Sequence, residues 1–419
     1  MTAPVREVSI VIPTHNRHAS VERTLTALST QSYPLTSIQV IVVADGCSDG
    51  TAALADGRWP MDVRIIEQAS QGPAAARNRG AAAATGRLLI FLDDDIEPSP
   101  GLVAAHAGAH AEDTAAVAIG YLPPQLQGRR DLFAMMLGAW WEAMFERMAA
   151  PGHRFAYTDL LSGNFSLSRS LFTRVGGFDE TLRCHEDYEL GLRLITAGAR
   201  LRFVREAAGW HHEHTVLVRA LQRKRDEGRA DVTLARRYPQ LISVLPLAAF
   251  PRHLTLRGRV LRRLALASPA AGDLMAAGCR SMLTVLERAR LRARWRRLLD
   301  DLLSYWYWRG VGEALSGDSL ETIRRSKAPP DSCDLDLRIG LEAAMQALDA
   351  IRPEAVRLRW GELTVGEIEP HPGAERLQGR HLPGLLRDRF AEPFAAALAR
   401  AHALENAGVS KHEATVDEA

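Results

Sequence analysis

The chain has 419 residues, of which 47% are hydrophobic and 24% are charged, so its composition is that of a globular protein and excludes extended disorder. Its formal net charge of only +2 gives no global electrostatic reason to bind nucleic acid. The four cysteines are scattered and form no C-x-x-C pair, which suits a reducing compartment. We find no leader peptide pattern and no apolar run near the roughly 20 residues that span a bilayer. The sequence therefore predicts a cytoplasmic protein, soluble or loosely attached to the inner face of the membrane.

Short apolar, β-branched runs alternate with Ala- and Leu-rich stretches in the first part of the chain. The pattern predicts strands at residues 7–14, 38–45, 63–68 and 86–93. Helices are expected between them, at residues 19–31, 51–58 and 73–84. Because strands that are apolar along their whole length need cover on both faces, the sequence predicts an α/β domain with a mainly parallel sheet.

A polar cluster follows three of these strands, at the point where each strand ends. The clusters read "PTHNR" after the first strand, "ADGCSDGT" after the second and "DDDIEPS" after the fourth. Ligands of open α/β sheets bind beyond the carboxyl ends of the strands. We therefore expect the three clusters to meet at one edge of the sheet and to form a binding site there.

The chain is expected to fold in three parts. The main domain covers residues 1–215, and a basic helical extension follows over residues 216–326. Residues 327–419 are expected to form a small appended α+β domain, with a helix at 341–351, a hairpin at 355–370 and a disordered last dozen residues.

Three consecutive carboxylates, Asp93, Asp94 and Asp95, end the fourth strand. Their mutual repulsion would be relieved by a divalent cation together with a ligand that carries phosphate groups. Mg²⁺ and Mn²⁺ are hard ions that prefer such oxygen ligands. The alternative interpretation is a helix N-cap followed by a solvated acidic turn.

The polar cluster after the second strand and the helix after the third strand each contain one candidate binding residue. Asp45 is placed to accept a hydrogen bond from the N–H of a nucleotide base, whereas Asp49 is expected to cap the following helix. Arg77 lies on the helix after the third strand, where it could reach a phosphate or orient an aspartate. A plain surface charge is the alternative for Arg77.

The stretch "HEDYELGLRL" places two carboxylates at the start of an amphipathic helix. Glu186 suits compensation of the helix dipole, while Asp187 is a candidate general base. Further on, "GWHHEH" supplies His211, His212 and His214, and three histidines this close together favour a metal ligand over a purely structural role.

Taken together, these segments resemble the family 2 glycosyltransferases, which are inverting enzymes with the GT-A fold. The matching segments, in family order, are "VSIVIPTHNR", "VVADGCSDGT", "GPAAARNRG", "FLDDDIEP", "GNFSLSRSLFTRVGGFDE", "HEDYELGLRL" and "HHEH". The resemblance implies a GT-A domain over residues 1–215, with a donor half at about 1–119 and an acceptor half at about 120–215. It also implies transfer of a sugar from a UDP-, GDP- or dTDP-linked donor to an acceptor hydroxyl.

The resemblance also assigns the donor side of the site. The donor-binding residues that it implies are Pro13, Thr14, His15, Asn16, Asp45, Arg77, Asp93 and Asp94. His15 stands where the family often has tyrosine, so the base would stack on an imidazole. Ala44 replaces one of two common acidic residues and leaves Asp45 as the contact to the base.

The same resemblance implies a metal and a base. Asp95, the last residue of a D-x-D pattern, would bind Mn²⁺ or Mg²⁺ at the diphosphate. His211 best matches the family's histidine ligand, with His212 and His214 as alternates. Asp187 matches the catalytic base, which would deprotonate the acceptor hydroxyl as it attacks the anomeric carbon and inverts the configuration.

The acceptor side is expected between the acidic triplet and the "GGFDE" segment. Its candidates are Trp140, Trp141, Gly163, Asn164 and Glu186. Tryptophan faces suit stacking on sugar rings, although packing in the core is the alternative for both tryptophans. The resemblance implies a glycan or lipid-linked acceptor in the synthesis of a cell-surface glycan, a polysaccharide or a glycolipid, and no nucleic-acid partner.

A basic amphipathic helix is expected over residues 280–310. Its apolar stripe consists of Leu291, Trp295, Leu298, Leu302 and Trp306. Such a stripe, with arginines around it, could lie on an anionic membrane, or it could pack against the main domain or a partner.

Other functions that suit an α/β sheet are less consistent with the motifs. A sugar nucleotidyltransferase needs a Gly-rich basic loop after the first strand, and a dinucleotide-dependent oxidoreductase needs G-x-G-x-x-G there; this chain has "PTHNRHAS". A catalytically inactive scaffold that binds nucleotide sugars is the non-enzyme alternative.

Overall fold

The computed structural model describes residues 7–57, 59–126, 128, 131–248, 255–315 and 331–416. Contacts divide the chain into two compact units, one formed by Met1–Met148 with Ala156–Ser326 and the other by Ala149–Phe155 with Lys327–Ala419. Each unit is described by itself.

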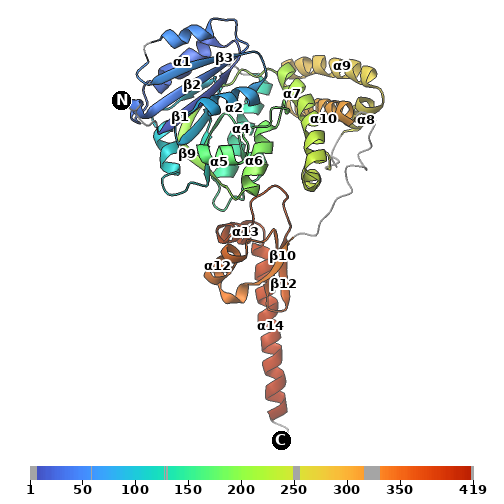
Figure 1. Ribbon diagram of the computed structural model, residues 1–419. Helices are drawn as coiled ribbons and strands as arrows, with labels where there is room; N and C mark the ends of the chain where they lie inside the picture. The colour runs from blue at the N-terminus through green and yellow to red at the C-terminus, as the bar shows by residue number, and fades with distance from the viewer. Residues whose placement is uncertain are drawn as a thin grey trace. The chain divides into compact units, whose positions relative to one another are not determined.

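A nine-stranded mixed sheet forms the centre of the first unit, with strand order β3-β2-β1-β4-β8-β6-β9-β5 and β7 paired to β9 (Figure 1). The strands are β1 (Val8–Thr14), β2 (Ile38–Asp45), β3 (Asp62–Gln68), β4 (Leu88–Leu92), β5 (Ile96–Pro98), β6 (Ala116–Tyr121), β7 (Pro124–Gln125), β8 (Asn164–Ser168) and β9 (Arg200–His212). Strands β3, β2, β1 and β4 pair in parallel, whereas β8 runs antiparallel to both β4 and β6. The four predicted strands are thus present, and they are parallel as predicted.

Helices cover this sheet because its central strands have no polar face. Every residue of β1, β2 and β4 is buried, which agrees with strands covered on both sides. The helices of this part are α1 (His18–Leu28), α2 (Pro73–Ala83), α3 (Leu102–Ala109), α4 (Leu132–Ala149), α5 (Arg169–Arg174) and α6 (Glu186–Thr196). The segment predicted as a helix at 51–58 is a 3₁₀ helix, η2 (Thr51–Asp56), which ends where the backbone of Gly57 becomes extended.

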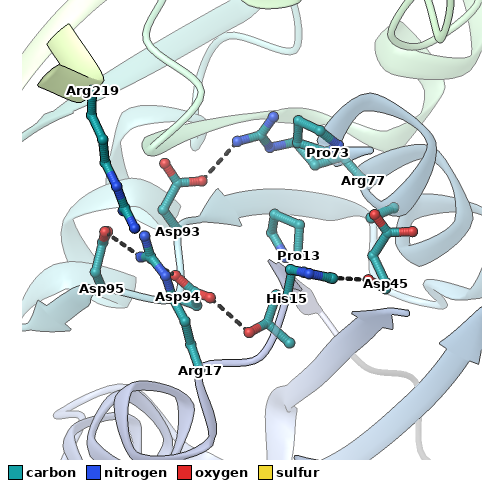
Figure 2. A pocket seen from close by; sticks show the side chains of 12 residues that line it. Pro13, His15, Arg17, Asp45, Pro73, Arg77, Asp93, Asp94, Asp95 and Arg219 are labelled. Carbon is teal, nitrogen blue, oxygen red and sulfur yellow. Dashed lines mark hydrogen bonds and ion pairs between the residues drawn. The ribbon is translucent and has the colours of Figure 1, made fainter. Parts of the chain in front are cut away.

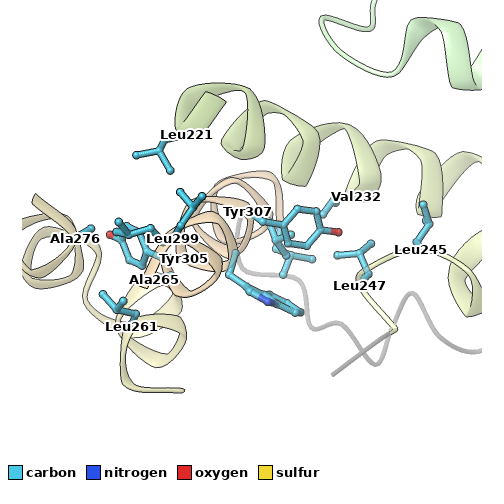
Figure 3. Packing of buried hydrophobic residues seen from close by; sticks show 14 of the residues in the cluster. Leu221, Val232, Leu245, Leu247, Leu261, Ala265, Ala276, Leu299, Tyr305 and Tyr307 are labelled. Atoms are coloured by element: carbon cyan, nitrogen blue, oxygen red, sulfur yellow. The ribbon is translucent and has the colours of Figure 1, made fainter. Parts of the chain in front are cut away.

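Four helices after the sheet belong to the same unit: α7 (Leu217–Arg237), α8 (Leu256–Ala267), α9 (Pro269–Arg288) and α10 (Arg292–Leu315). Helix α10 contacts the other three, and their apolar faces meet around Val232, Leu261, Leu299 and Tyr305 (Figure 3). The same core includes Leu192 of α6, so these helices pack directly behind the helix that begins with Glu186 and Asp187.

The expected single helix at 280–310 is two helices. Arg290 has a left-handed backbone (φ 56°), so α9 ends before it and α10 begins at Arg292. Most of the predicted stripe is core: Trp295, Leu298 and Leu302 are each less than 5% exposed. The structure therefore supports the packing interpretation of this stripe over the membrane interpretation.

The second unit contains a three-stranded sheet of β10 (Ser332–Asp336), β11 (Ala355–Trp360) and β12 (Leu363–Ile368). Strands β11 and β12 form the predicted antiparallel hairpin, and α12 (Leu341–Ile351) is the predicted helix. Two further helices are α13 (Leu382–Asp388) and α14 (Ala391–Val416). Helix α14 extends into the last dozen residues, for which the sequence predicts disorder; its many alanines favour a helix.

Short 3₁₀ turns complete the description: η1 (Leu35–Ser37), η3 (Tyr157–Asp159), η4 (Pro239–Ser243), η5 (Leu337–Ile339) and η6 (Gly379–His381). Within the described ranges, no helix combines the length and the apolar composition that crossing a bilayer requires.

Candidate active site

A pocket of about 440 Å³ lies at the carboxyl ends of β1, β2 and β4 (Figure 2). All three polar clusters contribute to it, as expected for side chains at one edge of a parallel sheet. The lining residues are Pro13, Thr14, His15, Arg17, Asp45, Pro73, Ala76, Arg77, Asp93, Asp94, Asp95 and Arg219. Four carboxylates and three guanidinium groups thus share one pocket, which suits a ligand that carries its own negative charge alongside polar groups.

Asp93 is held by a buried arginine. Arg77 Nη2 donates to Asp93 Oδ1 at 2.7 Å, and Arg77 Nη1 donates to Glu186 Oε1 at 3.1 Å. Burial lowers the pKa of Arg77, but the charges of Asp93 and Glu186 outweigh it and leave that pKa raised. Arg77 therefore orients an aspartate, one of the two functional roles expected for it, and it ties the start of α6 to the end of β4.

Asp94 and Asp95 share a second arginine. Arg17 Nη1 lies 3.0 Å from Asp94 Oδ1 and 2.7 Å from Asp95 Oδ2, while Thr14 Oγ1 donates to Asp94 Oδ2 at 2.6 Å. Burial raises the pKa of Asp94 to about 6, although Arg17 and Thr14 act against this shift. The repulsion within the triplet is thus already reduced by the guanidinium group of Arg77 and by that of Arg17, which the sequence pattern did not reveal.

Asp45 supports the loop that follows β3. Its carboxylate accepts hydrogen bonds from the backbone N–H groups of Gln71 (2.7 Å) and Gly72 (2.8 Å) and from Gln68 Nε2 (2.9 Å). Asp45 lies at the pocket, and the predicted bond to a base would use the remaining lone pairs of these same oxygens. His15 Nδ1 lies 2.6 Å from the backbone carbonyl oxygen of Asp45, which fixes the imidazole against the pocket wall.

Asn16 lies outside the pocket lining. Its backbone is left-handed (φ 52°), and its Oδ1 accepts a hydrogen bond from the backbone N–H of Ser48. The side chain therefore joins the loops after β1 and β2, and the structure does not place it in the donor pocket.

Asp187 lies at the start of α6, next to the loop that supports Asp93. Its Oδ1 accepts from the backbone N–H of Tyr188 (2.9 Å), and its Oδ2 accepts from the backbone N–H of Ser162 (3.3 Å). The adjacent Gly163 carbonyl accepts from the backbone N–H of Asp93 (3.0 Å). One short loop thus contacts the carboxylate of Asp187 and the backbone of Asp93, although Asp187 is not among the residues that line the pocket itself.

Helix α7 and helix α10 support the start of α6 through a buried polar network. His185, with a left-handed backbone (φ 61°), places its Nδ1 3.0 Å from Asp231 Oδ1 of α7. Tyr307 of α10 donates to Asp231 Oδ2 at 2.7 Å, and the ring of Tyr188 stacks on the imidazole. Burial lowers the pKa of His185, but the hydrogen bond and charge of Asp231 outweigh burial and leave that pKa raised. This favours a charged pair at this position.

His211 is the histidine that the structure brings to the triplet. Pairing of β5 with β9 sets Ile96 opposite His211, and His211 Nε2 lies 3.7 Å from Asp95 Oδ1. His212 is instead paired with Glu97 (2.8 Å), and His214 is exposed at the end of the segment. The imidazole of His211 thus faces the Asp95 carboxylate, whereas His212 contacts Asp95 through its backbone N–H, which donates to the Asp95 carbonyl oxygen at 3.0 Å.

The pair formed by Asp95 and His211 fits a hard divalent ion. It supplies one carboxylate and one imidazole, whose Nε2 faces Asp95 while its Nδ1 lies 3.9 Å from Glu213 Oε2. Within the described residues, no group of three or more His, Cys, Asp or Glu side chains is arranged to hold a metal. An ion there would take its remaining ligands from a diphosphate and from water, as Mg²⁺ commonly does.

The two tryptophans differ in their surroundings. Trp140 is 52% exposed, whereas Trp141 meets the ring of His211 edge-on and its Nε1 donates to Glu213 at 3.3 Å. Trp141 therefore lies beside the candidate metal ligand, and Trp140 offers an open face.

Other acceptor candidates prove structural. Asn164 is fully buried: its Nδ2 donates to the carbonyl of Ala207, and its Oδ1 lies 2.8 Å from His106 Nε2. Glu186, 8% exposed, is committed to Arg77. Gly163 permits close approach, because a Cβ there would lie 3.1 Å from Asp93 Oδ2. Neither Asn164 nor Glu186 is available to an acceptor in this arrangement, because their hydrogen bonds serve the fold.

Sequence reasoning missed four residues of the pocket lining, the apolar Pro73 and Ala76 and the basic Arg17 and Arg219. Arg17 ends the "PTHNR" cluster, so its position after β1 was a usable signal. Arg219 lies in the first turn of α7, and its side chain points into the pocket (Figure 2). Nothing in the local pattern of the basic helix distinguishes Arg219 from its neighbours, since only the packing of α7 directs it to the site.

Comparison with known proteins agrees with this geometry. The family model for glycosyl transferase family 2 matches residues 9–176, and the model described as the N-terminal domain of galactosyltransferase matches residues 142–215. The pre-mycofactocin glycosyltransferase of Mycobacterium tuberculosis is 31% identical over 250 residues, which cover 58% of this chain and 50% of that protein. The validoxylamine A glucosyltransferase of Streptomyces hygroscopicus subsp. jinggangensis is 33% identical over 243 residues, covering 51% of this chain and 57% of that protein.

The chain therefore spans about half the length of these curated relatives. Among solved structures, a mannosyltransferase from Pyrobaculum calidifontis in complex with GDP-Man and Mn²⁺ covers 75% of this chain and 88% of its own, at 18% identity and a TM-score of 0.49. The mixed, mainly parallel sheet with its flanking helices is GT-A-like, as predicted. By the family match over residues 9–176 and by these relatives, this part of the chain belongs to glycosyl transferase family 2.

Proposed function

We propose that this protein is an inverting glycosyltransferase that moves a sugar from a nucleotide-diphosphate sugar to an acceptor hydroxyl. The observation that carries the proposal is the pocket at the carboxyl edge of the sheet, where the acidic triplet, three arginines and His15 converge. Asp187, at the start of α6, contacts the Ser162–Gly163 loop that also contacts Asp93, so a reacting sugar at this edge would have a base close by.

The pocket divides by chemistry into two ends. Pro13, His15 and Asp45 offer an apolar ring, an imidazole and a carboxylate, which suit a nucleobase. At the other end, Arg17 and Arg219 offer guanidinium groups, whose planar forks suit phosphate oxygens. A nucleoside diphosphate spans such a site with its base at the first end and its phosphates at the second.

A divalent ion, Mn²⁺ or Mg²⁺, would be held by Asp95 and His211. When bound, it would offset the negative charge of the departing diphosphate. Arg17 already contacts Asp95 at 2.7 Å, so its guanidinium adds a positive charge at the same place.

Asp187 acts as the general base in the proposed reaction. Its carboxylate takes the proton of the acceptor hydroxyl while that oxygen forms a bond to the anomeric carbon. The bond between that carbon and the diphosphate oxygen breaks on the opposite face, and its electron pair leaves with the nucleoside diphosphate. Backbone N–H groups of Ser162 and Tyr188 keep the carboxylate of Asp187 oriented throughout.

The acceptor is proposed to be a glycan or a lipid-linked sugar, in the synthesis of a cell-surface glycan, a polysaccharide or a glycolipid. The exposed ring of Trp140 and the adjacent Trp141 support a sugar acceptor, because aromatic faces stack on sugar rings. A catalytically inactive scaffold would bind the donor in the same pocket but would not transfer the sugar. Its function would therefore not depend on Asp187.

Arg219 provides the test on the donor side. Arg219→Ala should raise the Kd of the nucleoside diphosphate about tenfold, since a charge-assisted hydrogen bond contributes on the order of 1.5 kcal/mol. Calorimetric titration with UDP, GDP and dTDP in turn, with Mn²⁺ present, measures this change. Arg236→Ala, at the other end of α7, is the matched control and should bind like the wild type. Equal affinity of Arg219→Ala and wild type would exclude a donor contact for Arg219.

A further inference from the structure

Helices α8 and α9 expose an unusual number of large apolar side chains. We name the exposed residues between 256 and 291 the α8–α9 surface. Its large apolar members are Leu256, Val260, Leu266, Leu274, Met282, Val285 and Leu291. Leu274 is 78% exposed and Leu256 is 71% exposed, values that no side chain of a folded core reaches. A concentration of this kind on a monomer marks an interaction site.

These side chains are not misplaced parts of the core, because each helix buries a different face. Leu261 and Ala265 of α8, with Ala276 and Leu283 of α9, pack into the core around α10 (Figure 3). Leu274 and Val285 are eleven residues apart, which is three helical turns, so they project from one side of α9. Both helices are therefore apolar on two faces, and the residues that the structure describes cover only one face of each.

Positive charges predominate on the α8–α9 surface. Its exposed arginines are Arg259, Arg263, Arg280, Arg288 and Arg290. Both carboxylates of the segment have partners: Asp273, whose side chain is 41% exposed, accepts from the hydroxyl of Tyr305 and pairs with Arg309, and Glu287 accepts from the backbone N–H of Leu132. A chain whose net charge is only +2 thus gathers positive charge here.

We propose that the α8–α9 surface docks on an anionic lipid bilayer. Leucine and valine side chains insert at the boundary between headgroups and acyl chains, and the arginines around them meet lipid phosphates. A second copy of this chain is a poorer occupant, because two such surfaces would repel each other. Nucleic acid would account for the arginines but would leave the apolar side chains in water. The docking surface does not depend on the proposed transferase activity.

Flotation of the full chain with lipid vesicles tests the proposal. The wild type should float with vesicles of phosphatidylcholine mixed with phosphatidylglycerol and remain in the dense fraction with phosphatidylcholine alone. Added salt should weaken the binding, because it screens the arginines from the lipid charge. No flotation with the anionic vesicles would overturn the proposal.

Two double variants separate the apolar from the charged contribution. Leu274→Ser/Val285→Ser and Arg263→Glu/Arg288→Glu should each lose at least tenfold in partitioning, and unchanged thermal unfolding would show that both still fold. Leu341→Ser/Ile351→Ser, which alters similarly exposed residues of the second unit, should float like the wild type. Full flotation of both test variants would contradict the proposal, as would a wild-type dimer in size-exclusion chromatography that either variant dissociates.

Discussion

Replacing Asp187 by asparagine should lower kcat by about 10³-fold or more, while the affinity for the nucleotide donor stays unchanged. The carboxamide has nearly the same shape, and its single oxygen can still accept from the backbone N–H of Ser162 or of Tyr188, so the fold around α6 should largely be kept although one of the two hydrogen bonds is lost. It cannot take a proton from an acceptor hydroxyl, and general-base catalysis is typically worth 10²- to 10⁴-fold. Release of nucleoside diphosphate in the presence of acceptor measures kcat.

Glu180→Gln is the control for that loss, since it neutralises an exposed carboxylate that precedes the same helix. It should turn over like the wild type. If Asp187→Asn also keeps wild-type turnover, Asp187 is not the base, and the proposed chemistry is wrong even if the donor binds.

Replacing Arg77 by leucine should reduce the free energy of unfolding by about 3 kcal/mol. Removing one partner from a buried ion pair typically costs about 3–5 kcal/mol because it leaves an uncompensated charge. The Arg77 side chain is 4% exposed and pairs with both Asp93 and Glu186. We expect a loss at the lower end of this energy range because the Asp93 side chain is 36% exposed, so water can solvate its charge. Urea unfolding at neutral pH measures the change.

Arg79→Leu is the matched control, because Arg79 lies on the same helix with its side chain exposed. It should change stability by less than about 0.5 kcal/mol. Adding Glu186→Gln to Arg77→Leu should restore part of the loss, since the two groups interact directly. Equal stability of Arg77→Leu and wild type would show that this guanidinium does not hold α6 to β4.

The sequence allowed the sheet and the location of the pocket to be predicted because both depend on local patterns. β1, β2 and β4 are apolar along their whole length, and the polar residues that follow them meet at one edge wherever such strands run parallel. His211 could be ranked above His212 only by its spacing, and the pairing of β5 with β9 gives the physical reason.

What the sequence could not predict depends on contacts between distant residues. Arg77 and Glu186 are 109 positions apart, so neither local pattern announces their pairing. Asn164 was an acceptor candidate because it lies between the acidic triplet and the "GGFDE" segment, yet its hydrogen bonds to Ala207 and His106 make it part of the core. The position of Arg219 of α7 in the pocket depends on how the helices pack against one another. The periodicity of α7 alone does not predict that packing.

The most direct test of the central claim is whether this pocket binds a nucleoside diphosphate. Thermal unfolding of the full chain should be measured with UDP, GDP, dTDP and CDP, each with and without Mn²⁺, for the wild type and for Asp95→Ala. A ligand at a hundred times its Kd stabilises the fold by about 2.7 kcal/mol, which is readily detected. The expected result is stabilisation by one nucleotide that needs Mn²⁺ and is lost in Asp95→Ala. Absence of stabilisation by every nucleotide would contradict the assignment of this pocket as a donor site.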